Sequence, residues 1–175
     1  MKGYIALGSN LGDRAGYLLL ALSRLSSLPQ TRLSRLSQVY QTDPVGPPVK
    51  SHSDPAMAGT QGQGPYLNMV AEIESGLEPQ SLLQALLEIE KSLGRERTVR
   101  WGARTLDLDL LLYGEWVADI PQLTLPHPRL HERAFVLAPL CDLIPEARHP
   151  SLGMTYRQLL ERVDSKGVRV WEKPL

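Results

Sequence analysis

Hydrophobic positions along the chain follow two spacings, one of two residues and one of three to four, and each spacing predicts a different element. Apolar stripes at helical spacing predict two amphipathic helices. One follows Gly12-Asp13 and ends before Pro29, and the other opens at Pro79 and stops at Gly94. Short apolar runs bounded by turn residues predict strands. We predict strands at residues 4–7, 32–41, 66–73, 105–113, 116–118 and 168–171, a hairpin turn at Gly114-Glu115, and a last helix at about 155–163.

The order of these elements predicts the fold class. It is strand, helix, two strands, helix and strand, with further elements at the C-terminal end. Two helices packed on one mostly antiparallel sheet form a ferredoxin-like α+β sandwich. The length of 175 residues suits one domain, so we expect residues 1–175 to form a single domain. Residues 44–65 hold five prolines and four glycines without periodicity, so we expect a long mobile loop there.

Composition excludes several classes of protein. The formal net charge is zero, so the chain lacks the basic field of a non-specific nucleic-acid binder, and any anion site must be local. The single cysteine, Cys141, cannot form an intrachain disulfide, and its apolar neighbours predict a buried, inert thiol. No apolar run approaches the length of a membrane span, and residues 1–8 are too short for a secretory signal. We therefore expect a cytoplasmic protein that binds neither nucleic acid nor membranes. We also expect a monomer, although nothing in the composition determines the oligomeric state.

The strand predicted at 105–113 carries the most informative pattern, because it contains Asp107 and Asp109. Alternate side chains of a strand point to opposite faces, so the two carboxylates share one face. The leucines at 106, 108, 110 and 112 then point into the core. About 6.6 Å of strand separates the aspartates, which is close enough to share one divalent cation or a pair of them. Hard oxygen ligands favour Mg²⁺, which binds through one or two carboxylates plus substrate phosphates.

A solvated outer face of the sheet is the alternative for these two aspartates. Aspartate is a poor strand former, and two neighbouring like charges repel each other, so a bound cation would offset both costs. Arginines at 95, 97, 100 and 104 precede the pair. They are either an exposed basic loop or a clamp of forked, charge-assisted hydrogen bonds on phosphate oxygens.

Four further side chains suit a nucleotide or a flat heterocycle. His127 is held between two prolines and can donate to a phosphate oxygen, and Arg133 can add a second clamp. Tyr66 and Asn68 share a strand face, which places a ring for stacking beside an amide for hydrogen bonding. A turn histidine without a role and ordinary sheet packing are the alternatives. Phe135 is the only phenylalanine, and core packing is its default role.

The segment at residues 8–12, Gly-Ser-Asn-Leu-Gly, follows a strand and precedes a helix, as a phosphate-binding loop does. It lacks the Gly-Lys-Ser/Thr ending of a Walker A loop, so we interpret it as a turn.

Several of these segments also carry a family resemblance. They are residues 4–14 (YIALGSNLGDR), 66–68 (YLN), 100–109 (RWGARTLDLD), 126–130 (PHPRL) and 133–137 (RAFVL). In this order they resemble the 6-hydroxymethyl-7,8-dihydropterin pyrophosphokinases of tetrahydrofolate biosynthesis, from Tyr4 to about Pro145. The resemblance implies transfer of pyrophosphate from ATP to the hydroxymethyl oxygen of the pterin, with release of AMP.

The resemblance also implies roles for particular residues. Asp107 and Asp109 would hold two Mg²⁺ ions, with Arg95 and Arg104 stabilising the transferred group. The residues implied to bind the pterin are Thr42, Asp43, Val45, Tyr66, Asn68, Trp101 and Phe135. The residues implied to bind ATP are Glu90, Arg97, Arg100, Leu110, Thr124, His127 and Arg133.

The chain departs from the family pattern in two places. The loop at 44–65 is longer than the family usually carries, and Leu87 stands where some members place a glutamine that contacts the nucleotide. Two other functions stay open at this point. One is a different metal-dependent transferase, such as a nucleotidyltransferase, which would release pyrophosphate rather than AMP. The other is a ferredoxin-like binding module without catalysis.

Overall fold

A computed structural model describes residues 1–43, 64–94 and 105–175 of the chain. Its elements are β1 (Lys2–Ser9), α1 (Arg14–Ser26), β2 (Thr31–Leu36), β3 (Tyr40–Thr42), β4 (Tyr66–Ser75), α2 (Pro79–Ser92), β5 (Asp107–Tyr113), β6 (Ala118–Ile120), β7 (Leu123–Leu125), the short 3₁₀ helix η2 (Leu130–Glu132), α3 (Ala134–Leu143), α4 (Tyr156–Leu160) and β8 (Val168–Val170).

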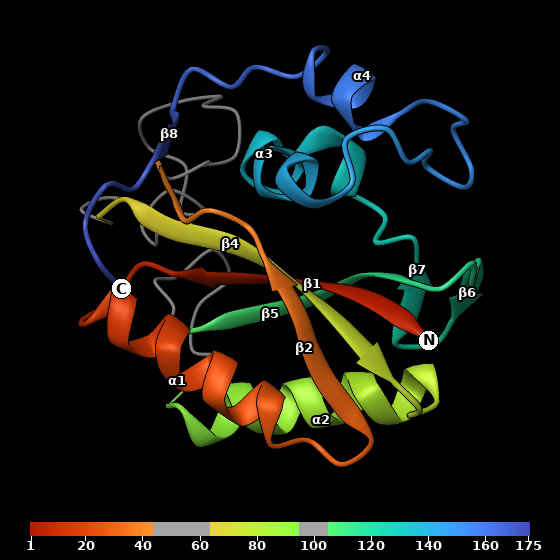
Figure 1. Cartoon of the computed structure of the whole chain (residues 1–175), viewed down its shortest axis with the longest axis horizontal. Helices are drawn as coiled ribbons and strands as arrows, with labels where there is room; N and C mark the ends of the chain where they lie inside the picture. The colour runs from red at the N-terminus through yellow and green to blue at the C-terminus, as the bar shows by residue number, and fades with distance from the viewer. Residues whose placement is uncertain (44–63, 95–104) are drawn as a thin grey trace, which may run out of the picture.

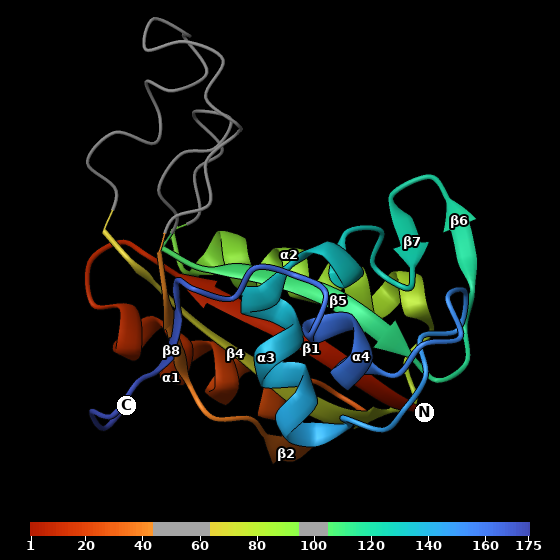
Figure 2. The same ribbon diagram turned by 90° about the horizontal axis from the view of Figure 1, so that it is seen from above.

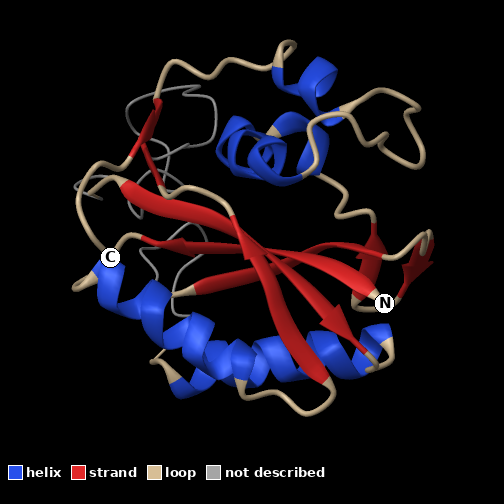
Figure 3. Cartoon of the chain, in the orientation of Figure 1, coloured by secondary structure: helices blue, strands red, loops and turns tan. Residues whose placement is uncertain are grey.

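One antiparallel sheet organises the described part of the chain. Its strands run in the order β5-β1-β4-β3-β8, and β2 also pairs with β4 (Figure 1). Helices α1 and α2 cover one face, and α3 and α4 cover the other, so the sheet lies between two helical layers (Figure 3). The predicted ferredoxin-like α+β class is confirmed, with α3, α4 and β8 as C-terminal additions.

The two faces of the sheet have separate hydrophobic cores. The α1/α2 face packs Ile5 and Leu7 of β1 with Leu106, Leu108 and Leu110. The α3/α4 face packs Tyr4, Val70 and Leu112 with the buried side of α3. The prediction that Leu112 shares a face with the other leucines is wrong, because the β1–β5 register shifts between Tyr4 and Ile5. Such a register shift is a β-bulge, and its extra residue turns the next side chain to the opposite face of the sheet.

Helix ends follow the signals in the sequence. Asp13 caps α1 by accepting a hydrogen bond from the Gly16 N–H at 3.0 Å. Pro79 opens α2 as its first residue, and Gly94 follows its end at a φ of +83°, a left-handed conformation that suits glycine.

Several predicted elements differ from the observed ones. Residues 32–41 form two strands rather than one, because the Ser37 hydroxyl accepts a hydrogen bond from the Val70 N–H and interrupts the ladder. Strand β6 pairs with β7 in a separate small sheet instead of forming a hairpin with β5, as Figure 2 shows beside the end of β5. The helix predicted at 155–163 is shorter, at Tyr156–Leu160.

Helix α3 has no counterpart among the predicted elements. Every residue from Val136 to Leu140 is buried, because the helix lies between the sheet and α4, so the segment shows no polar side from which to detect a period. Cys141 on this helix is half-buried rather than fully buried, and burial raises the pKa of its thiol to about 11.

Within the described residues, no helix combines the length and apolarity needed to cross a bilayer.

Candidate active site

A single row of residues crosses the sheet and brings the candidate site together. Gly8 on β1 pairs with Asp107 on β5 on one side and with Asn68 on β4 on the other, and Asn68 pairs in turn with Tyr40 on β3. Directly paired residues of antiparallel strands share a face. Because Leu108 and Leu110 pack toward α1 and α2, this row lies on the face that α3 covers.

Gly8 contributes no side chain to the buried stretch of sheet between the carboxylates and the amide. Adjacent strands lie about 4.8 Å apart, so the backbones of Asp107 and Asn68 stand about 10 Å apart, and Gly8 between them carries no side chain. A Cβ atom on Gly8 would lie only 2.9 Å from the Asn68 side-chain oxygen. The interpretation of Gly8 as the start of a turn is therefore wrong, since it lies inside β1. The sequence did carry a signal: the helix begins only several residues after Gly8, and a glycine inside a strand often marks the close approach of a ligand or another backbone.

Asp107 and Asp109 alternate with buried leucines as expected. Both aspartates are partly exposed, whereas Leu108 is 3% exposed. One Asp109 carboxylate oxygen lies 3.6 Å from the Arg133 guanidinium and 3.9 Å from the Nε2 atom of His127. The structure thus brings together a strand, the turn after β7 and the start of α3 around one carboxylate.

His127 is held from both sides. Its backbone N–H donates to the Leu111 carbonyl at 2.9 Å, and its Nδ1 atom accepts from the Arg129 N–H at 3.2 Å. An accepting Nδ1 leaves the proton on Nε2, the atom that faces Asp109. Burial, together with the Arg133 cation, lowers the pKa of His127 to about 4. The imidazole is therefore a neutral donor at pH 7.

Arg133 and Phe135 lie at the start of α3. The Arg133 guanidinium stands over the Phe135 ring at 5.7 Å from its centroid, a cation–π distance. Phe135 is partly exposed at the edge of the α3/α4 core, so one side of its ring packs while part of it stays accessible.

On the other side of Gly8 from the carboxylates lie polar groups of β3 and β4. The Asn68 side-chain N–H donates to the Thr42 hydroxyl at 2.6 Å, and both side chains are buried. Tyr66 pairs with Thr42 and is half-buried. Asp43 is exposed, and one of its carboxylate oxygens lies 3.4 Å from Arg169.

Three residues expected near a nucleotide have structural contacts of their own. Glu90 is 2% exposed and accepts a hydrogen bond from the Leu108 N–H at 2.7 Å, which fixes β5 to α2. Leu110 faces the α1/α2 core, so a nucleotide contact there would use its main chain. The Thr124 hydroxyl donates to Asp119 at 3.1 Å. The remaining predicted site residues lie outside the described ranges: Val45, Arg95, Arg97, Arg100, Trp101 and Arg104.

The donor set suits a cation that arrives with a substrate. Among the described residues, no group of three or more His, Cys, Asp or Glu side chains forms a cage for a metal ion. Two carboxylates on one face of a strand instead match the partial protein coordination that Mg²⁺ uses beside substrate phosphates. The Arg133 cation and the neutral His127 donor next to Asp109 suit phosphate oxygens.

Comparison with known proteins agrees with this geometry. A model of the 7,8-dihydro-6-hydroxymethylpterin-pyrophosphokinase (HPPK) family matches residues 4–145. The chain belongs to this family. Two HPPK relatives carry the name 2-amino-4-hydroxy-6-hydroxymethyldihydropteridine pyrophosphokinase. The Bacillus subtilis protein is 40% identical over 97% of this chain and 90% of its own length, and the Pseudomonas aeruginosa protein is 42% identical over 94% and 93%.

Solved HPPK structures share the fold. The HPPK-DHPS protein of Plasmodium falciparum, solved with pterin and p-hydroxybenzoate, superimposes with a TM-score of 0.68 at 17% identity. The match covers 92% of this chain and 42% of that one, so it shows the fold of the HPPK part alone. HPPK membership makes this chain an ATP-dependent pyrophosphokinase of folate biosynthesis.

Proposed function

We propose that the chain transfers pyrophosphate from ATP to the hydroxymethyl group of 6-hydroxymethyl-7,8-dihydropterin with Asp107 and Asp109 as ligands of two Mg²⁺ ions. The observation that carries the proposal is the pair of carboxylates on the α3 face of β5, with Arg133 and His127 beside Asp109. When bound with ATP, Mg²⁺ would neutralise triphosphate charge and favour attack by the pterin alcohol.

The pterin would lie over Gly8. The ring would stack between Phe135 and Tyr66, and the Asn68 amide and Thr42 hydroxyl would read its polar edge. Asp43, Val45 and Trp101 complete the proposed pterin contacts. A flat heterocycle needs one apolar surface and a few fixed polar groups, and this stretch of sheet offers both.

ATP would extend from β5 toward the β7–α3 turn. His127 and Arg133 would donate to phosphate oxygens, and Arg97 and Arg100 would add further contacts. Glu90, Leu110 and Thr124 complete the proposed nucleotide contacts. Because His127 is neutral with its proton on Nε2, it donates without adding charge.

In the reaction the pterin oxygen attacks the β-phosphorus of ATP and forms a new P–O bond. The bond from that phosphorus to the bridging α,β-oxygen breaks, and AMP leaves with the electron pair. The alcohol gives up its proton, for which Asp109 is the candidate acceptor. Arg95 and Arg104 would stabilise the transferred group, because phosphoryl-type transfer depends on alignment and charge more than on covalent help from the protein.

The test is turnover of Asp107→Asn and Asp109→Asn, with Asp164→Asn as a control for an exposed aspartate away from the site. Removing one of the two charges should lower kcat by about 100-fold or more, with the melting temperature preserved. Mass spectrometry should find AMP and pterin diphosphate as products; free pyrophosphate would favour a nucleotidyltransferase. Near-normal kcat in both variants at saturating Mg²⁺ would remove the carboxylates from the mechanism.

We also propose that residues 1–175 form one domain, with the segment at 44–65 as a loop of it, working as a cytoplasmic monomer without nucleic-acid or membrane partners. The neutral net charge supports the absence of a polyanionic partner.

A further inference from the structure

The C-terminal end of α3 is tied to the β2–β3 segment by a carboxylate that the proposed reaction does not use. Asp142 accepts one hydrogen bond from the Gln38 N–H at 3.0 Å and another from the Tyr40 hydroxyl at 2.9 Å. Tyr40 lies on β3, two residues before Thr42. This carboxylate therefore joins the helix to the strand that carries one of the proposed pterin contacts.

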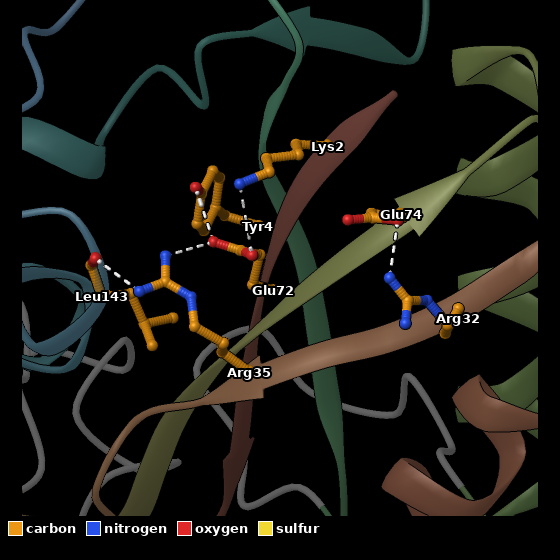
Figure 4. Close-up of polar contacts among 7 residues, drawn as sticks. All are labelled: Lys2, Tyr4, Arg32, Arg35, Glu72, Glu74 and Leu143. Carbon is orange, nitrogen blue, oxygen red and sulfur yellow. Dashed lines mark hydrogen bonds and ion pairs between the residues drawn. The ribbon is translucent and has the colours of Figure 1, made fainter.

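A second attachment lies next to the first. The Arg35 guanidinium donates to the Leu143 carbonyl at 3.1 Å, which satisfies one of the unpaired carbonyls at the end of the helix. The same guanidinium donates to Glu72, which also accepts from the Tyr4 hydroxyl at 2.9 Å (Figure 4). The Arg35 hydrogen bond is the main cause that lowers the pKa of Glu72, so the buried carboxylate is ionised and holds Arg35 in place.

The spacing along α3 connects these attachments to the opposite end of the helix. Phe135 and Asp142 are seven residues apart, which is two helical turns, so they lie on the same side of α3 about 10 Å from each other along the axis. Tyr40 pairs directly with Asn68, and Asn68 donates to Thr42. One hydrogen bond between Asp142 and Tyr40 thus links the helix that presents Phe135 to the strands that present Asn68 and Thr42.

We propose that Asp142 and Tyr40 are positioning residues for the pterin, because their hydrogen bond sets the spacing between the Phe135 ring and the Asn68–Thr42 edge. This inference rests on the proposed pterin contacts of Phe135 and Asn68. The hydrogen bond lies on the outside of the molecule, where one such bond adds little to global stability. Its effect should therefore appear in the fit of the pterin rather than in the fold.

Tyr40→Phe is the sharpest variant, since it removes the hydroxyl and keeps the ring. Asp142→Ala removes the acceptor. Tyr40→Phe should raise KM for the pterin about three- to ten-fold, the effect of about one hydrogen bond, and Asp142→Ala, which also removes the acceptor of the Gln38 N–H, should raise it at least as much. In both variants kcat and KM for ATP should change less than about two-fold. The double variant should be no worse than Asp142→Ala, because that change already breaks the hydrogen bond that Tyr40→Phe removes.

Two further variants make the outcome decisive. Glu146→Gln is the control. It removes an exposed ion pair with Arg157 at 2.8 Å, which joins the α3–α4 connection to α4, and it should leave KM for the pterin and KM for ATP unchanged. Phe135→Ala reports on the pterin contact itself. Suppose that Phe135→Ala raises KM for the pterin, whereas Tyr40→Phe and Asp142→Ala lower only the melting temperature. Tyr40 and Asp142 would then be structural, and the inference would fail while the proposed function stands. If Phe135→Ala leaves KM for the pterin unchanged, the pterin lies elsewhere, and the inference fails together with the proposed pterin contacts, whereas the product analysis tests the proposed reaction separately.

Discussion

Replacing Gly8 with alanine tests whether the stretch of sheet at Gly8 receives the pterin. The added Cβ atom would lie 2.9 Å from the Asn68 side-chain oxygen, closer than real Cβ atoms approach a neighbour. Asn68 cannot simply rotate away, because it is buried and its amide donates to Thr42 at 2.6 Å. The variant must therefore displace the amide proposed to read the pterin edge.

The size of the effect follows from the cost of overpacking. An extra methyl group in a well-packed position costs about 1–3 kcal/mol. If that cost falls on the bound state, the dissociation constant of the pterin rises about 5- to 150-fold, since about 1.4 kcal/mol corresponds to a factor of ten. The nucleotide contacts proposed at His127 and Arg133 do not touch Asn68, so affinity for an ATP analogue should change less than about two-fold.

Isothermal titration with the pterin and with a non-hydrolysable ATP analogue measures both affinities. Gly76→Ala is a matched control, because its Cβ atom would lie at the same 2.9 Å from a side-chain amide oxygen, that of Gln30, on an exposed turn. An unchanged pterin affinity in Gly8→Ala, with the fold intact, would show that the pterin does not lie over Gly8.

Two other predictions concern the Phe135 ring and the buried Glu72 carboxylate. Phe135→Ala should weaken pterin binding about ten-fold or more through loss of the stacked ring, and ATP-analogue binding far less; equal losses in titration would indicate a packing role. Glu72→Gln should lower the melting temperature at pH 7 by about 6–12 °C, because breaking a buried ion pair whose Arg35 partner stays half exposed costs about 3 kcal/mol. The control is Glu74→Gln, which breaks an exposed pair with Arg32 at 2.9 Å and should shift the melting temperature by less than about 4 °C. Because Arg35 holds the pKa of Glu72 below its ordinary 4.5, this stabilisation is present above pH 4.5 and is lost as the pH falls through the native pKa. The difference in melting temperature between the wild type and Glu72→Gln should therefore narrow in acid. A constant difference from pH 7 to pH 3 would contradict the assignment.

Local patterns in the sequence were enough to predict the features that depend on neighbours in the chain. Alternation in β5 placed Asp107 and Asp109 on one face, and the Asp13 and Pro79 signals placed the starts of α1 and α2. These features depend on strand geometry and on helix capping, which a few adjacent residues determine.

Features that depend on distant partners were missed. The exchange of faces at Leu112 comes from a bulge against Tyr4, and the role of Gly8 comes from two cross-strand neighbours far away in sequence. Helix α3 was missed because its consecutive residues 136–140 are all buried, which removes the polar stripe that marks a surface helix. Its attachment through Asp142 to Tyr40 spans 102 residues, a pairing that no local spacing indicates.

The most direct test of the central claim counts the metal ions. Mn²⁺ can replace Mg²⁺ as a paramagnetic probe, and electron paramagnetic resonance can titrate it against the protein with a non-hydrolysable ATP analogue and the pterin. We predict two bound ions per chain in the wild type, and a loss of bound Mn²⁺ in Asp107→Asn and Asp109→Asn but not in Asp164→Asn. Full Mn²⁺ occupancy in both site variants would contradict the claim that these two carboxylates hold the metal.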